Sequence, residues 1–302
     1  MKRSSMVHAA LGMAAFLALG SAAQARPADP LQVYTQVYGT NPGYTLDDRQ
    51  VGYVAVAASG STAFSAATAQ ADYGVLKGMI SYSVVNHFGE ADYGNAHAEA
   101  SMADSMTIDS VALHDTQGTF DAKVSLHSIL STIGTLPVGA DVAMNYSFQG
   151  YLGTEGLDGQ YLSRDGKFHY ENGDWQSDFS YDPNAVLEFT NVPFIYGKPI
   201  GISLGFLVAG TGSLSNPDTT EDASFTTTLD MGHTLKWEGL TVIRDSLGQE
   251  VFNSASGQTL ADIGMSLSSV SGTDWSTPVP EPATLSLLML GGLALLRRKR
   301  TT

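Results

Sequence analysis

Two short patterns in this 302-residue chain contain residue types that carry out catalysis in other proteins. Residues 201–205 read Gly-Ile-Ser-Leu-Gly, which matches the Gly-x-Ser-x-Gly pattern of serine hydrolases. That chemistry needs the serine on a sharp turn between a strand and a helix, whereas Ser203 falls inside an alternating segment that predicts a strand. His97 and Glu99 would share one face of a strand, but a catalytic zinc site needs three protein ligands. We therefore expect strand residues here, and no enzyme.

Carboxylates and aromatic side chains are concentrated between residues 155 and 181. Glycosidases use paired carboxylates about 5 to 9 Å apart, and aromatic rings stack on sugar rings. Acidic loops between strands are the simpler explanation for the carboxylates. The aromatic residues nevertheless make this the segment in which we look for contacts with a glycan: Tyr161, Tyr170, Trp175 and Tyr181.

A second acidic cluster lies in residues 216–222, which read Asn-Pro-Asp-Thr-Thr-Glu-Asp. Calcium is a hard cation that binds six to eight oxygen atoms, and Asp218, Glu221 and Asp222 would supply some of them. The segment lacks the Asp-x-Asp-x-Asp-Gly pattern of an EF-hand loop. Calcium is therefore an alternative only, and the sequence otherwise predicts no metal and no cofactor.

The last two dozen residues combine three physically different pieces. Pro280-Glu281-Pro282 cannot be helical, because each proline fixes its own φ and pushes the preceding residue toward an extended conformation. Residues 283–296 carry no charge, and as a helix they would be about 21 Å long. A cationic stop follows, consisting of Arg297, Arg298, Lys299 and Arg300. Basic residues after an apolar run stay on the cytoplasmic side, which predicts a short transmembrane helix with the body outside.

In order and spacing these pieces resemble the PEP-CTERM sorting signal, here from Val279-Pro280-Glu281-Pro282 to the basic stop. The resemblance covers residues 279–302 only. It implies that a membrane enzyme, exosortase, recognises the chain, cleaves it near the motif, and leaves the product released or attached at the surface of a Gram-negative bacterium. Many proteins of this family are linked to exopolysaccharide production and to biofilm or floc matrices.

The other end of the chain agrees with export. Lys2 and Arg3 form a positive start, residues 9–19 an apolar core, and Ala23-Gln24-Ala25 a small-residue cleavage site. Signal peptidase would cut after Ala25, which makes residues 1–25 a signal peptide. The two ends together predict an inner-membrane intermediate that is held through residues 283–296 and a final location at the outer surface or in the extracellular matrix.

Composition limits what the remaining body, residues 26–278, can do. The chain has 30 acidic and 15 basic residues, and six of the basic ones lie in the two terminal segments, so the body is strongly acidic. Such a surface repels nucleic acids and anionic lipids. The chain has no cysteine, so a packed core and not disulfides must stabilise the exported domain.

Alternation of apolar and polar residues recurs along the body and predicts about ten strands. It is clearest at residues 119–127, 141–149 and 199–209, with further candidates at 51–57, 75–85, 102–108, 186–190, 224–231 and 234–243. Residues 27–48 are expected to be an exposed lead-in, and residues 259–267 to hold at most a short helix. Half-polar strands of this kind predict an all-β fold, an antiparallel β-sandwich of jelly-roll type.

These observations predict an acidic, exported β protein with a structural or adhesive role in the extracellular matrix. The alternative is a carbohydrate-binding module for the cell's own exopolysaccharide. An aromatic row on one sheet face would favour the alternative, and an evenly polar surface would favour the structural role. The expected partners are signal peptidase and exosortase during export, with exopolysaccharide as a partner in the alternative.

The sorting tail generates the first testable prediction. Replacing Pro280, Glu281 and Pro282 with alanine should leave a full-length species in the inner membrane, because the kink, the apolar run and the basic stop act as one signal. Immunoblotting of membrane and extracellular fractions measures this. Normal release of a shortened product from the variant would contradict the sorting role.

Overall fold

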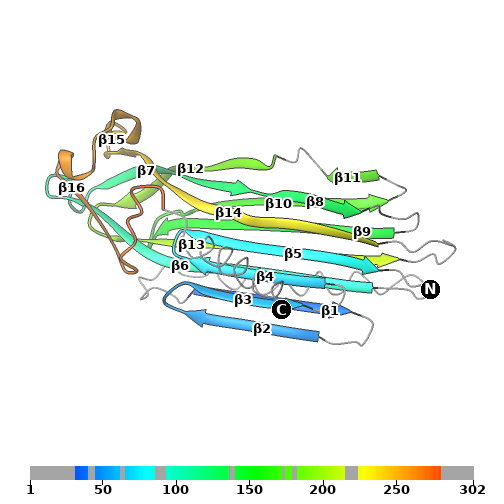
Figure 1. Cartoon of the computed structure of the whole chain (residues 1–302). Helices are drawn as coiled ribbons and strands as arrows, with labels where there is room; N and C mark the ends of the chain where they lie inside the picture. The colour runs from blue at the N-terminus through cyan, green and yellow to red at the C-terminus, as the bar shows by residue number, and fades with distance from the viewer. Residues whose placement is uncertain are drawn as a thin grey trace, which may run out of the picture.

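The computed structural model describes residues 31–39, 45–61, 65–85, 93–134, 136, 140–171, 174–178, 182–214 and 224–279. In these ranges the regular elements are strands, apart from two single-turn 3₁₀ helices, η2 (Ser254–Ser256) and η3 (Ala261–Ile263). The strands form two antiparallel sheets that lie one over the other (Figure 1). The fold is therefore all-β and is consistent with the expected antiparallel sandwich.

Sheet A contains eight strands in the order β11-β10-β9-β13-β6-β1-β2, and β16 pairs with the C-terminal end of β6. Its three long central strands are β9 (Ala140–Thr154), β13 (Pro199–Leu214) and β6 (Tyr93–Ser110). The shorter strands around them are β1 (Leu31–Gly39), β2 (Thr45–Gly52), β10 (Gln160–Glu171), β11 (Asp174–Asp178) and β16 (Met265–Ser269).

Sheet B also contains eight strands, in the order β12-β7-β14-β5-β4-β3, with β8 and β15 each paired to β14. Its organising strand is β14 (Ser224–Arg244), which pairs with β5 on one side and with β8 and then β7 on the other. The remaining strands are β3 (Val56–Ser61), β4 (Ser65–Asp72), β5 (Val75–Val85), β7 (Gln117–His127), β8 (Ile129–Gly134), β12 (Asn184–Ile195) and β15 (Glu250–Asn253).

One apolar cluster fills the space between the two sheets. Along β9, every second residue from Val142 to Leu152 is buried, while Asp141 and Gln149 point outward and are exposed. The same period of two runs along β6, β7 and β13, because successive side chains of a strand point to opposite faces. The segments predicted from alternation at 119–127, 141–149 and 199–209 therefore lie in strands.

Glycines on one sheet make room for aromatic rings on the other. A Cβ atom on Gly78 of β5 would lie 2.6 Å from Cε1 of Phe206, a fully buried ring on β13. Gly212 of β13 makes the same kind of room for the ring of Tyr82 on β5. Because protein interiors are close-packed, these ring-against-glycine contacts set how closely the two layers approach.

This packing gives a stability prediction. Gly78→Ala should lower the free energy of unfolding by about 1–3 kcal/mol, because a methyl group at this site overfills a close-packed core. The matched control is Ser203→Ala, on the outward side of β13, which should change stability by no more than about 0.5 kcal/mol. Denaturant unfolding of both variants measures the difference. Equal free energies of unfolding would contradict the close packing of Gly78 against Phe206.

The structure corrects the expectation of an exposed lead-in at residues 27–48. Leu31, Val33 and Val37 on β1 are at most 1 % exposed and belong to the core. Buried Thr35 interrupts their apolar pattern, so the local alternation of this segment does not predict a strand. Tyr34 and Tyr38 alternate with these residues and lie on the opposite face of the strand.

Other strand boundaries also differ from the sequence prediction. The predicted strand at 51–57 contains a bend, so that β2 ends at Gly52 and β3 begins at Val56. The predicted strands at 224–231 and 234–243 are one strand, β14, whose pairing with β5 shifts register between Met231 and Leu235. Met231 and Leu235 are both fully buried, so the side chains keep the same inward face across the irregularity, although in a sequence it looks like a strand end.

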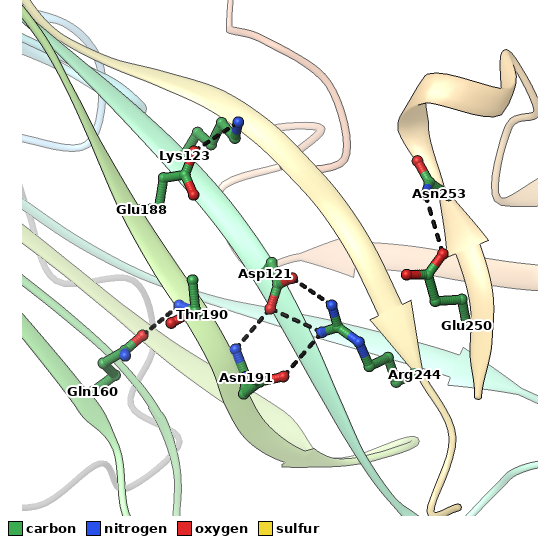
Figure 2. A network of polar contacts seen from close by, with 9 residues as sticks. All are labelled: Asp121, Lys123, Gln160, Glu188, Thr190, Asn191, Arg244, Glu250 and Asn253. Carbon is green, nitrogen blue, oxygen red and sulfur yellow. Dashed lines mark hydrogen bonds and ion pairs between the residues drawn. The ribbon is translucent and has the colours of Figure 1, made fainter. Parts of the chain in front are cut away.

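An ion pair ties three strands of sheet B together near one end of the sandwich (Figure 2). Arg244 of β14 donates to both carboxylate oxygens of Asp121 on β7, with Nη1–Oδ1 and Nη2–Oδ2 distances of 2.9 and 2.8 Å. Asn191 of β12 donates its backbone N–H to Asp121 Oδ1 at 2.6 Å and accepts from Arg244 through its side chain. Asn191 has φ of +54° at the register shift between Phe189 and Val192. The carboxylate thus holds a β-bulge in place.

The ion pair shifts the acid–base equilibrium of Asp121. Burial raises the pKa of its carboxyl group, but the hydrogen bonds from Arg244 and Asn191 and the charge of Arg244 together lower that pKa below its ordinary value. A folded-state pKa below the unfolded value of about 3.9 means that the stabilisation is present above that pH. It is lost as the pH falls through the folded-state pKa.

Asp121→Asn should therefore lower the free energy of unfolding at pH 7 by about 1.5–3 kcal/mol, the scale of hydrogen bonds to a charged group. The difference from the natural chain should shrink as the pH falls below about 4. Glu188→Gln is the control, because it breaks the exposed Lys123–Glu188 pair (2.7 Å) and should cost at most about 1 kcal/mol. A difference that stays constant from pH 7 to pH 3 would contradict the electrostatic explanation.

Candidate binding face

The outward side of sheet A is a broad face made of small and polar side chains. Antiparallel registers align its residues in rows across neighbouring strands; one row consists of Tyr34, Glu99, Leu207 and Ser147. A second row, four residues along, consists of Ala103, Ser203, Tyr151 and Tyr161. At its centre β13 presents residues with little or no side chain: Gly201, Ser203, Gly205 and Ala209. We call this surface the outer face of sheet A.

Two tyrosines lie side by side on this face. The ring centroids of Tyr151 on β9 and Tyr161 on β10 are 4.5 Å apart, and Tyr161 is 63 % exposed. Tyr151 lies over two glycines: a Cβ on Gly153 or Gly159 would meet its ring within 2.7 Å. Partial burial, with Tyr161 as a second cause, raises the pKa of Tyr151. Tyr151 therefore keeps its proton near pH 7. Both residues offer flat rings with hydroxyl groups that donate and accept hydrogen bonds.

A second aromatic group lies on the same face at β1 and β6. Tyr34 and His97 make an edge contact at 5.5 Å between centroids, and Tyr38 contacts Tyr93 in the same way at 6.0 Å. Glu99 lies 3.5 Å from His97, between Oε2 and Nε2. Burial, together with Asp47 and Glu99, raises the pKa of Tyr34. Three strand spacings and four residues separate Tyr34 from Tyr151, which places the two groups about 20 Å apart.

The four aromatic residues predicted to contact a glycan do not share a face. Tyr161 points outward, but Tyr170 is 8 % exposed and donates its hydroxyl to the carbonyl oxygen of Leu136. Trp175 on β11 packs against Tyr170 and the core, and Tyr181 lies outside the described residues. Tyr161 and Tyr170 are nine positions apart on one strand, and an odd separation puts two side chains on opposite sides.

Sequence reasoning identified Tyr161 but missed the other tyrosines on the outer face of sheet A. Tyr151 lies just beyond the predicted strand 141–149. Tyr34 and Tyr38 lie in residues 27–48, the segment predicted to be an exposed lead-in. The parity of β9 contained the signal for Tyr151, because it is an even number of residues from the outward Asp141 and Gln149. That Tyr161 lies beside it depends on the register of β9 with β10, which the sequence does not state.

The remaining candidates are placed as follows. Ser203 lies within β13, paired on both sides, and not on a strand-to-helix turn. His97 and Glu99 point to the same side of β6. Within the described ranges no group of three or more His, Asp or Glu side chains could hold a metal ion. The calcium candidates Asp218, Glu221 and Asp222 lie outside those ranges.

The end of the chain indicates the export route of the protein. Comparison with protein families matches residues 278–300 to the PEP-CTERM protein-sorting motif. The chain carries a PEP-CTERM sorting signal. This agrees with the resemblance in Pro280-Glu281-Pro282 and in the basic stop, and it implies export and processing through the exosortase pathway.

A search of curated proteins finds no match to this chain. No helix in the described part of the chain is long and apolar enough to span a membrane. The predicted transmembrane helix at residues 283–296 and the signal peptide with its Ala23 and Ala25 site both lie outside that part.

Proposed function

We propose that this protein is a structural or adhesive component of the extracellular matrix, the biofilm or floc matrix, of a Gram-negative bacterium. The PEP-CTERM signal supports this proposal, because it implies export along the membrane-anchored sorting route. The outer face of sheet A would then make the adhesive contact. The observation that supports this assignment is the shape of the face: long strands with small residues in the middle and tyrosines at both sides.

A face with small residues at its centre suits adhesion for a physical reason. Small residues such as Gly201, Gly205 and Ala209 let a partner approach the sheet closely over several strands. Tyrosine supplies a large contact area at a low cost in conformational entropy, because its side chain has only two χ angles. Many copies in one matrix would act together, so weak single contacts add up to firm attachment. The proposal includes no catalytic step and no cofactor.

The second candidate function is binding of the cell's own exopolysaccharide, which the Tyr151–Tyr161 pair favours. The apolar side of a sugar ring stacks on an aromatic ring, while its hydroxyl groups need hydrogen-bond partners nearby. The outer face of sheet A offers both, since Ser163 and Gln149 form the next row beside the two tyrosines. The acidic body would favour a neutral or cationic polysaccharide over an anionic one.

The decisive variant is Tyr151→Ala combined with Tyr161→Ala, expressed as the full chain in the producing cell. We expect matrix-bound protein to fall about tenfold, because aromatic anchors carry a large share of the energy of such contacts. Tyr53→Ala is the matched control, since Tyr53 is 68 % exposed but lies between β2 and β3, away from the two tyrosines. Equal retention of the double variant and the control would contradict adhesion through this face.

A panel of extracellular polysaccharides in affinity electrophoresis separates the two candidates. Retardation of the purified protein that the double variant abolishes would support polysaccharide binding. Loss from the matrix without retardation by any polysaccharide would support a structural role through other matrix components. Melting temperatures of the three proteins verify that the substitutions leave the sandwich folded.

A further inference from the structure

The segment just before the sorting signal is built into the sandwich. At its start, the backbone N–H of Val270 donates to Ser105 of β6 in sheet A at 3.0 Å. At its end, the backbone N–H of Val279 donates to Trp237 of β14 in sheet B at 3.1 Å. Residues 270–279, which we call the clasp, therefore connect the two layers (Figure 1).

A fully buried tryptophan anchors the middle of the clasp. Trp275 has no exposed surface, and its ring packs edge-on against Trp237 at 5.3 Å between centroids. Its Nε1 donates to Asp104 Oδ2 at 2.7 Å, and Trp237 Nε1 donates to the Trp275 carbonyl oxygen at 2.8 Å. Asp104 is 6 % exposed on the core side of β6 and also accepts from the Ser271 backbone N–H and hydroxyl. The clasp thus satisfies a buried carboxylate that would otherwise lack these partners.

The body is shaped to receive the clasp at two glycines. Gly74, with φ of +81°, has no room for a side chain, because a Cβ would lie 2.7 Å from Cγ2 of Val279. Gly239, with φ of +94°, comes equally close to the clasp, since a Cβ would lie 2.9 Å from the carbonyl oxygen of Ser276. Both positions combine a left-handed backbone with direct contact, so the clasp fits closely against the sandwich.

The sorting motif begins inside this clasp. The matched motif starts at residue 278, and Pro280 directly follows the residue whose N–H is bound to Trp237. No spacer separates the folded body from Pro280-Glu281-Pro282. A processing enzyme that binds its substrate as an extended strand needs free backbone on the N-terminal side of the motif, and there the backbone is already paired with the body.

We propose that the clasp must release from the body before the sorting signal can be processed, so that the stability of the clasp sets the rate of processing. Local opening of a packed segment is unfavourable, and only the open fraction would be a substrate. Folding of the body would thereby slow cleavage at the sorting signal, and the chain would remain longer as a membrane-held intermediate. The proposal rests on the sorting signal and not on the matrix role or on the outer face of sheet A.

The principal test inserts eight Gly and Ser residues between Val279 and Pro280 in the full chain. Every contact of the clasp remains, but the motif gains free backbone in front of it. Pulse-chase labelling in the native host should show processing accelerated about tenfold, the gain expected when a locally closed state no longer hides the site. The matched control places the same insert between Leu247 and Gly248, in the exposed turn after β14, and should be processed at the natural rate.

A second variant weakens the clasp itself. Ser271→Ala removes the hydroxyl that donates to Asp104 and should both speed processing several-fold and increase hydrogen exchange in residues 270–279 over that in β13. The insert keeps the test decisive if this substitution disturbs folding. Processing of the insert variant at or below the rate of its control, or faster exchange in Ser271→Ala without faster processing, would overturn the proposal.

Discussion

The structure depends on burying the inner sides of two large sheets without covalent support. The chain has no cysteine, so burial of apolar surface between the layers has to offset the entropy of ordering the described body. Rings such as Phe206 fit against glycines such as Gly78 on the opposite sheet, and this sets the distance between the layers. The long strands meet the same need, because β6, β13 and β14 each contribute many inward residues to one cluster.

The outer face of sheet A is a consequence of that core. Each inward residue on a strand commits its neighbours to the outside, so the long strands that fill the core also generate a long outward surface. Small residues there do not affect the packing of the core. Both tyrosines of the Tyr151–Tyr161 pair lie on paired strands, and the Tyr151 ring packs against Gly153 and Gly159. An aromatic pair held on paired strands would lose less entropy on binding than one on unpaired backbone.

The clasp joins the fold to the route of export. Asp104 is buried in the core side of sheet A, and most of its hydrogen bonds come from residues near the far end of the chain. A buried carboxylate without partners is costly, so docking of the clasp completes the sandwich. The residues that pair with Asp104 are thus the ones that lead directly into the sorting signal.

The sequence by itself determined the export route and the fold class. Pro280-Glu281-Pro282, the apolar run and the basic stop are contiguous, and alternation along 119–127, 141–149 and 199–209 needs no partner strand to be seen. Only the tertiary structure decided which residues meet. Register put Tyr161 beside Tyr151, strand parity turned Tyr170 inward, and packing brought Trp275 to Asp104 across 171 positions. Such contacts depend on pairing and packing between distant segments, and the local pattern that predicts a strand contains no information about its neighbours.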